Sequence, residues 1–223
     1  MKTRWLSTAL MVAGALLLVT SGGYFGLVAY ARHDAANFVN EELPREQRPS
    51  AHPEAGLLLG SSAVDDTFTE VIPRTYSAPY AFVVPSIGVE SSVVPVGIIV
   101  NKDGELEWET PKHAVGHHAG TANPGLSGNV VLSGHISSPI RREGNVFNRL
   151  PQVKLGDEVV VTTTEGVYTY QVVSRRVVEP TEISVLDPTD TPTLTLVTCY
   201  PDLIYPHRLV LRAEPVSFAP HPG

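Results

Sequence analysis

Three residues with reactive side chains each stand at the end of an apolar run of the sequence. Cys199 follows the run 194–198, His135 follows the run 129–134, and Arg208 opens the last apolar run. A cysteine can act as a nucleophile, a histidine can transfer protons, and a guanidinium can donate hydrogen bonds to a developing oxyanion. A site made of these three side chains needs a rigid sheet to hold them in position.

Short β-rich runs provide the elements for such a sheet. From residue 78 onward, short apolar runs alternate with Pro, Gly, Asn and Asp, a pattern typical of an all-β sandwich or barrel. Residues 164–166 and 101–104 have the composition of hairpin turns. One short helical turn is expected at 145–150. The predicted strands cover 81–87, 91–100, 129–134, 157–163, 167–179, 193–198 and 208–214.

An uncharged run over residues 5–31 opens the chain. It is longer than the roughly 20 apolar residues that cross a bilayer, and Lys2 and Arg4 precede it. We therefore expect residues 1–32 to form a membrane anchor with a cytoplasmic N-terminus and an extracellular remainder. A cleavable secretory signal is the alternative, because 29–31 resembles a small-residue cleavage site, but the apolar core of such signals spans only about 7–15 residues.

The remainder of the chain divides into three predicted parts. Residues 33–75 are rich in Ala, Pro, Glu, Arg and Ser and predict a flexible tether. Residues 76–216 form the predicted folded domain, and 217–223 a tail. Beyond residue 32 the chain has 13 Lys and Arg against 23 Asp and Glu, a formal charge of −10. This balance argues against nucleic acid or anionic lipid as a partner.

Each reactive residue also has a purely structural interpretation. Cys199 is the only cysteine, so no internal disulfide can form, and it is either a small buried side chain or a reactive one. His135 could simply end a strand. Arg208 could be a surface charge, and Arg212, on the same strand face, is a rival for its role.

A second group of histidines could bind metal. His113, His117 and His118 lie close in sequence, but no cysteine or carboxylate completes a familiar zinc spacing, and the segment around them is interpreted as a loop. The acidic residues at 65–66 and 187–190 are interpreted as tether and turn residues, not as calcium ligands. We therefore expect no metal and no other cofactor.

Three blocks of the sequence resemble the sortase family. The segment TLTLVTCYP at 193–201 is similar to the sortase strand Thr-Leu-x-Thr-Cys that delivers the nucleophile. The segment GLSGNVVLSGH at 125–135 resembles the family's histidine block, and RLVLRAE at 208–214 resembles its arginine strand. The three blocks occur in the family's order, and the likeness spans about residues 80–214.

The resemblance implies a fold and a reaction. The fold is an all-β, eight-stranded barrel with short helical turns, preceded by a transmembrane helix. Cys199 would attack a Thr-Gly-like bond in a C-terminal sorting motif and form a thioacyl intermediate. His135 would transfer the proton, Arg208 would stabilise the oxyanion, and Thr198 would support it. The short interval 200–207 is most similar to class D and class E members.

The resemblance also implies partners. These are surface proteins with an LPxTG-like motif and an amine from a cell-wall precursor or a pilin lysine. An L,D-transpeptidase-type wall enzyme is a rival, but it would show a Ser-His-Gly-Cys-like block, whereas Cys199 follows Val197 and Thr198. A non-catalytic extracellular β-domain for adhesion or scaffolding is the rival from another class, and it would tolerate the loss of Cys199.

Overall fold

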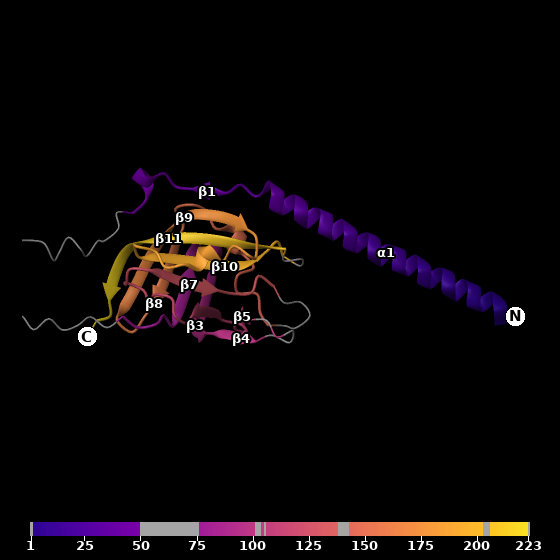
Figure 1. Ribbon diagram of the computed structural model, residues 1–223, viewed down its shortest axis with the longest axis horizontal. Coiled ribbons are helices and arrows are strands. Elements are labelled where there is room, and N and C mark those ends of the chain that lie inside the picture. The colour runs from indigo at the N-terminus through magenta and orange to yellow at the C-terminus, as the bar shows by residue number, and fades with distance from the viewer. Residues whose placement is uncertain are drawn as a thin grey trace, which may run out of the picture.

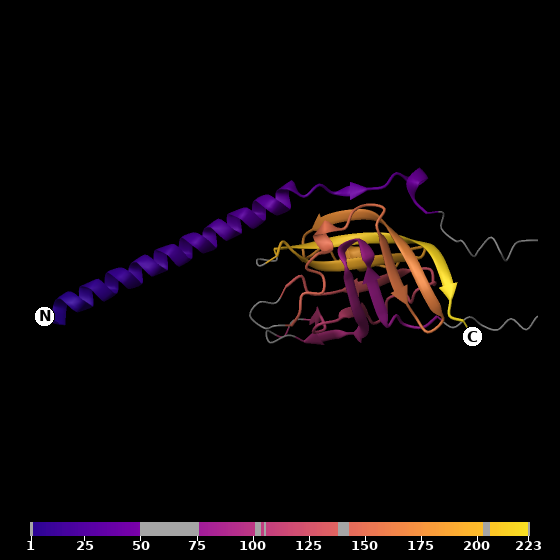
Figure 2. The same cartoon turned by 180° about the vertical axis from the view of Figure 1, so that it is seen from behind.

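A long helix and a β-barrel make up the structure, a computed structural model that describes residues 2–49, 76–100, 104, 106–137, 143–202 and 206–222. Helix α1 (Lys2–Asn37) leaves from one end of the barrel, as both views show (Figure 1, Figure 2). Within the described part of the chain, no helix combines the length and the apolar character of a membrane span.

Eight strands close into a barrel. Their order is β9-β11-β10-β7-β6-β3-β2-β8, and β8 pairs again with β9. The predicted eight-stranded all-β barrel is therefore confirmed. The barrel strands are β2 (Ala81–Val84), β3 (Val89–Val96), β6 (Val115–His118), β7 (Asn129–Ser133), β8 (Glu158–Thr162), β9 (Gly166–Val178), β10 (Thr193–Tyr200) and β11 (His207–Pro220).

Shorter elements complete the domain. The strands β4 (Ile98–Val100) and β5 (Leu106–Trp108) form a separate hairpin, whose predicted turn at 101–104 lies mostly outside the described residues. Short 3-10 turns within the barrel domain include η3 (Pro85–Ile87), η4 (Leu150–Gln152) and η5 (Ile183–Leu186). Residues 146–149 form the turn that was expected at 145–150.

The two faces of the strands have different partners. On β10, Leu194 and Leu196 point into the barrel, where they are fully buried in the main core with Phe82 and Phe147. Val197 belongs to the opposite, outer face, because side chains alternate along a strand. There it packs with a small cluster of Val178, Val185 and Val210, together with Leu186. This outer cluster holds η5 and the connection between β9 and β10 against the barrel.

The segment that follows α1 lies on the barrel. Strand β1 (Glu41–Glu42) pairs with β9, and η1 (Arg45–Gln47) follows it. The Leu43 amide donates a hydrogen bond to the Val173 carbonyl at 2.7 Å. A flexible tether was expected over the whole of 33–75, whereas the part up to residue 49 is packed on the domain, and 50–75 lie outside the described residues.

The segment 112–118 was interpreted as a loop, which is wrong for its second half: residues 112–114 form a turn, but 115–118 form strand β6. His117 and His118 belong to β6, which pairs with both β3 and β7, and both side chains are buried. The short run Val-Gly-His-His lacks the apolar alternation of a typical strand. Its imidazoles can be buried because hydrogen bonds to Ala122 and Ser133 satisfy part of their polar atoms.

Candidate active site

Three adjacent strands bring Cys199, His135 and Arg208 to one end of the barrel. Strands β7 and β10 are parallel, with Ser133 beside Val197, and His135 and Cys199 each stand two residues further along. Strands β10 and β11 are antiparallel, and Cys199 lies directly opposite Arg208. Residues directly opposite each other share a face of the sheet. The nucleophile candidate therefore lies between the candidate base and the candidate cation.

The loop that carries His135 is fixed to the cysteine strand. The Gly134 amide donates to the Val197 carbonyl at 3.3 Å, and the Thr198 hydroxyl donates to the Gly134 carbonyl at 2.8 Å. Thr198 is 3% exposed and faces away from the outer side of the sheet. The hydrogen bond of Thr198 therefore positions the loop that carries His135. That Thr198 also supports the oxyanion stays a prediction. Gly134 also needs its small size, because an added Cβ would lie 2.7 Å from Val146.

The environment of His135 favours a neutral imidazole. Burial lowers the pKa of His135 below its usual value, while the nearby Glu143 carboxylate and a ring hydrogen bond to the Thr110 carbonyl oppose this shift. Its Nε2 is buried and has no hydrogen-bond partner among the described residues. A neutral imidazole with an unused nitrogen can accept a proton from a thiol or an amine.

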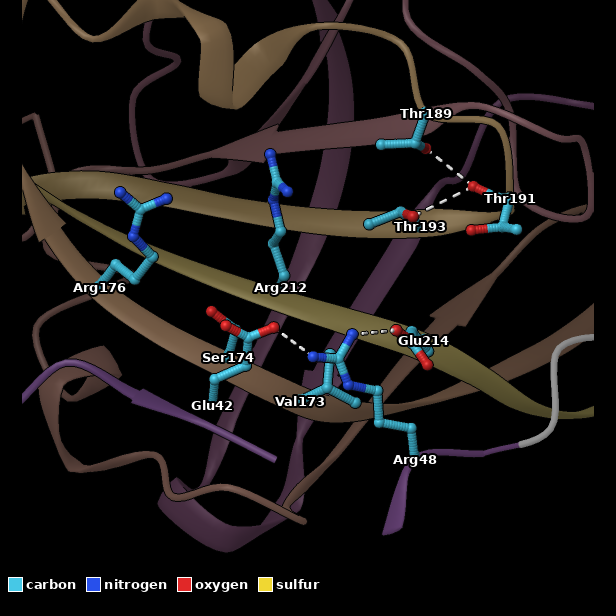
Figure 3. Close-up of a pocket in the computed structure, with 10 residues that line it drawn as sticks. All are labelled: Glu42, Arg48, Val173, Ser174, Arg176, Thr189, Thr191, Thr193, Arg212 and Glu214. Carbon is cyan, nitrogen blue, oxygen red and sulfur yellow. Dashed lines mark hydrogen bonds and ion pairs between the residues drawn. The ribbon is translucent and has the colours of Figure 1, made fainter. Parts of the chain in front are cut away.

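Arg208 and Arg212, the two candidates for the polarising cation, occupy different places on β11. A guanidinium nitrogen of Arg208 donates to the His207 carbonyl at 3.0 Å, next to the cysteine strand's end. Arg212 lies opposite Thr195, four residues further along β11, or about 13 Å away. It lines a separate polar pocket of about 240 Å³ with Ser174 and Thr193, among other residues (Figure 3). The structure thus separates Arg212 from Cys199.

An apolar groove lies on the outer face near the start of β7. Its volume is about 550 Å³, and its walls include Trp108, Leu126, Ile183 and Leu186. Asn129 fixes one wall, because its Nδ2 donates to the Val185 and Asp187 carbonyls at 3.2 and 3.1 Å. Strand β7 begins at this groove and ends next to His135, so β7 connects the groove to the end of the barrel where the three reactive residues lie.

Several contributors to the site carry no signal in the sequence. Thr110 lies 25 residues before His135 and Glu143 lies eight residues after it, and neither position matches a recognisable pattern with His135 in the sequence. Tyr200 directly follows Cys199, but its partner Asp34 is 166 residues away. Among the described residues, no three His, Cys, Asp or Glu side chains are grouped so that they could hold a metal ion.

His118 occupies a buried position at the end of β6, beside the end of β7. Its Nε2 lies 2.8 Å from the Ser133 hydroxyl, and its ring centroid lies 4.5 Å from that of Trp108. Burial, and then the nearby His117, lower the pKa of His118 to about 4. The side chain is therefore neutral at pH 7.

We expect His118 to make the fold acid-sensitive. The unfolded chain binds a proton on this residue below about pH 6.5, whereas the folded chain binds it only near pH 4, so the stabilisation present at pH 7 is lost as the pH falls. Between pH 6.5 and pH 5 the loss should be about 2 kcal/mol in the free energy of unfolding. His118→Gln should remove this part of the pH dependence in urea denaturation of the detergent-solubilised chain.

The exposed His33 provides the matched control for this measurement. His33→Gln should keep the parent's pH dependence, because it changes an exposed side chain and leaves the buried His118 in place. Equal slopes for the parent and His118→Gln would show that His118 is protonated as easily in the fold as in the unfolded chain.

The chain is similar in sequence to known proteins. A family model described as the sortase domain matches residues 82–216. Sortase A of Listeria monocytogenes is 38% identical over 72 residues, which cover 32% of this chain and 31% of that protein. Sortase D of Bacillus subtilis is 27% identical over 130 residues, which cover 58% of each chain. The matched parts therefore span less than two thirds of the length of either relative.

Solved sortase structures resemble the barrel. Listeria monocytogenes sortase A superposes with a TM-score of 0.52 and 26% identity, covering 66% of this chain and 92% of that chain. Sortase E of Streptomyces avermitilis gives a TM-score of 0.51 and 29% identity, covering 66% and 93%.

Proposed function

Because the chain belongs to the sortase family, we propose that it is a cysteine transpeptidase that cleaves a C-terminal sorting motif in surface proteins and transfers the acyl group to an amine. The observation that carries this proposal is the strand register, which sets Cys199 beside His135 on one side and opposite Arg208 on the other. The family relationship extends over the same three strands.

The proposed first half-reaction forms a thioester. The Cys199 sulfur bonds to the carbonyl carbon of the scissile Thr-Gly-like bond, and the thiol proton passes to His135. His135 then gives this proton to the departing amine as the carbon–nitrogen bond breaks. Arg208 donates hydrogen bonds to the oxygen that carries the negative charge between these events.

The proposed second half-reaction transfers the acyl group. An amine of a peptidoglycan precursor or a pilin lysine attacks the thioester, loses a proton to His135, and displaces the Cys199 sulfur, which recovers the proton. The lowered pKa of His135 suits this step, because a neutral imidazole is needed each time a proton is taken up.

The apolar groove fits the part of a substrate that precedes the motif. The seven residues from Asn129 to His135 span about 20 Å, whereas the leucine and the threonine of an LPxTG-like motif are three residues, or about 10 Å, apart in an extended chain. A peptide laid along β7 with its threonine at Cys199 would therefore place the residues before the motif near Ile183 and Trp108. The LPxTG-like substrate itself is proposed from the family relationship.

The comparisons favour neither rival function. The family model and the relatives are sortases, not L,D-transpeptidases or adhesion domains. Sortases of types A, D and E all match, so a class D-like or E-like specificity stays a prediction.

Acyl transfer to a defined amine tests the proposed function. The full chain in detergent would be incubated with fluorescent peptides carrying LPxTG and variant motifs, with triglycine or a lysine peptide as acceptor. We expect cleavage between Thr and Gly and a mass-spectrometric product that joins the acyl part to the acceptor. Absence of cleavage across the panel would favour the non-catalytic β-domain.

We also propose that residues 5–31 anchor the enzyme in the cell membrane, with the barrel outside. The support is the uncharged sequence run and its exposed apolar side chains in α1, which include Leu16, Leu17, Phe25 and Tyr30. Cell fractionation should recover the chain in the membrane after carbonate washing, and protease added to intact protoplasts should digest the barrel. Release into the medium would instead indicate a cleaved signal.

A further inference from the structure

The last turn of α1 and the residue that follows the helix contact Tyr200, the residue next to the nucleophile candidate. The Tyr200 hydroxyl donates to a carboxylate oxygen of Asp34 at 2.6 Å. The Phe38 ring packs against the Tyr200 ring with 5.5 Å between centroids and an edge-on angle of 68°. Tyr200 is only 7% exposed. A buried tyrosine hydroxyl needs an acceptor, and within the described residues Asp34 provides it.

Further contacts hold this segment on the barrel. The Arg175 guanidinium lies 5.1 Å from the centre of the Phe38 ring and pairs with Glu41 at 2.9 Å. Arg48 then pairs with both Glu42 and Glu214, as Figure 3 shows. The segment 34–48 is therefore fixed to β9 and β11 at its far end and to Tyr200 at its near end.

Tyr200 is linked through the backbone to two of the three reactive residues, Cys199 and Arg208. Tyr200 is the last residue of β10, directly after Cys199, and its backbone pairs with His207, the neighbour of Arg208. Its ring belongs to the main core, and strand alternation sets it on the opposite face from Cys199 and Arg208, although Cys199 also packs at the edge of that core. Tyr200 is bonded to Cys199 through the backbone and paired with His207, so a displacement of its ring can be transmitted to the backbone that carries the sulfur and the guanidinium.

We propose that Asp34 and Phe38 are positioning residues of the catalytic unit, which hold Tyr200 and thereby keep Cys199 and Arg208 aligned with His135. This inference rests on the proposed function and extends the catalytic unit to the juxtamembrane segment 34–48, beyond the barrel itself. A misplacement of about 1 Å at reacting atoms can cost up to about 100-fold in rate, so loss of one such contact should have a measurable effect.

The variants Tyr200→Phe and Asp34→Ala test the hydrogen bond. Each should lower kcat about 10-fold and leave KM within about twofold, because neither touches the groove beside Trp108 and Ile183. The double variant should be no slower than either single variant, since both remove the same contact. Asp34→Asn should recover part of the rate, because its amide oxygen can still accept the bond.

Two matched controls separate this effect from general damage. Tyr80→Phe removes the hydroxyl of an exposed tyrosine, and Glu46→Gln changes an exposed charge within the same segment. Both should match the parent in kcat and KM, measured with the full chain in detergent. Additive losses for Asp34 and Tyr200, or equal changes in kcat and KM, would overturn the positioning role.

A second readout does not depend on acyl transfer. The rate at which iodoacetamide alkylates Cys199 would be followed from pH 6 to pH 9 for the parent, Tyr200→Phe and Tyr80→Phe. The profile should move in Tyr200→Phe and stay unchanged in Tyr80→Phe, because only the first change relocates the sulfur relative to His135 and Arg208. Identical profiles would overturn the inference, whereas a shifted profile in a chain that cleaves no peptide would refute only the proposed function.

Discussion

Cys199→Ala should abolish acyl transfer, with kcat lowered by at least about 10⁴-fold, the scale seen when a catalytic nucleophile is removed. The described chain holds a single thiol, at the end of β10 between the positions of His135 and Arg208. Because the sequence has no second cysteine whose thiol could replace it, no thioester can form. The measurement is peptide cleavage with an amine acceptor, followed for long enough to detect slow turnover.

The same variant should remain folded. Cys199 is only partly buried and lies at the edge of the main core, so removal of one sulfur leaves a small loss of packing. We expect the melting temperature to fall by no more than a few degrees, and Val197→Ala on the same strand gives a comparable control for lost volume. An unfolded Cys199→Ala chain would support the structural interpretation of the cysteine, and residual full activity would exclude it as the nucleophile.

Arg208→Ala should lower kcat/KM by about 10²–10³-fold, as loss of one oxyanion donor does. Arg208→Lys should restore little, because a single ammonium cannot reproduce the planar pair of donors. Arg212→Ala should stay within a few-fold of the parent, since Arg212 stands opposite Thr195 and lines the pocket of Figure 3. Steady-state kinetics on the three variants, with thermal melting as the check on folding, provide the comparison.

The two arginines serve as controls for each other. They occupy the same strand and the same face, so a general effect of removing a cation from β11 should appear in both variants. A larger loss for Arg212 than for Arg208 would place the polarising cation at the other end of the strand. Equal losses would indicate a long-range electrostatic effect and no specific contact.

The barrel was predictable because most of its strands are plain apolar runs between turn residues. All seven predicted runs contain strands of the structure, and the run 91–100 divides at Gly97 into β3 and β4. Strand β6 was not predicted, because two of its four residues are histidines and the run lacks an apolar pattern. Strand β1 escaped because its two glutamates have no intrinsic strand preference, and only pairing with Arg175 and Ser174 of β9 makes them a strand.

The sequence predicted the three reactive residues of the candidate site but not the residues that surround them. The order of the three blocks predicted Cys199, His135 and Arg208 as the site, and the register shows that strand ends bring these three positions together. The partners that tune these residues come from elsewhere in the chain. Thr110 and Asp34 act through a carbonyl or a carboxylate that only the folded chain brings near, so no local pattern marks them.

The parallel pairing of β7 with β10 has a consequence for how the protein assembles. Parallel neighbours need a long crossover, and here β8 and β9 form within it before β10 enters the sheet. Strands β10 and β11 together fill the gap between β7 and β9, so the last part of the chain closes the barrel. Contacts this distant in sequence form slowly. Cys199 therefore reaches its place beside His135 only when the strands that close the barrel are in the sheet, and a fragment that ends before β10 has neither the nucleophile nor a closed barrel.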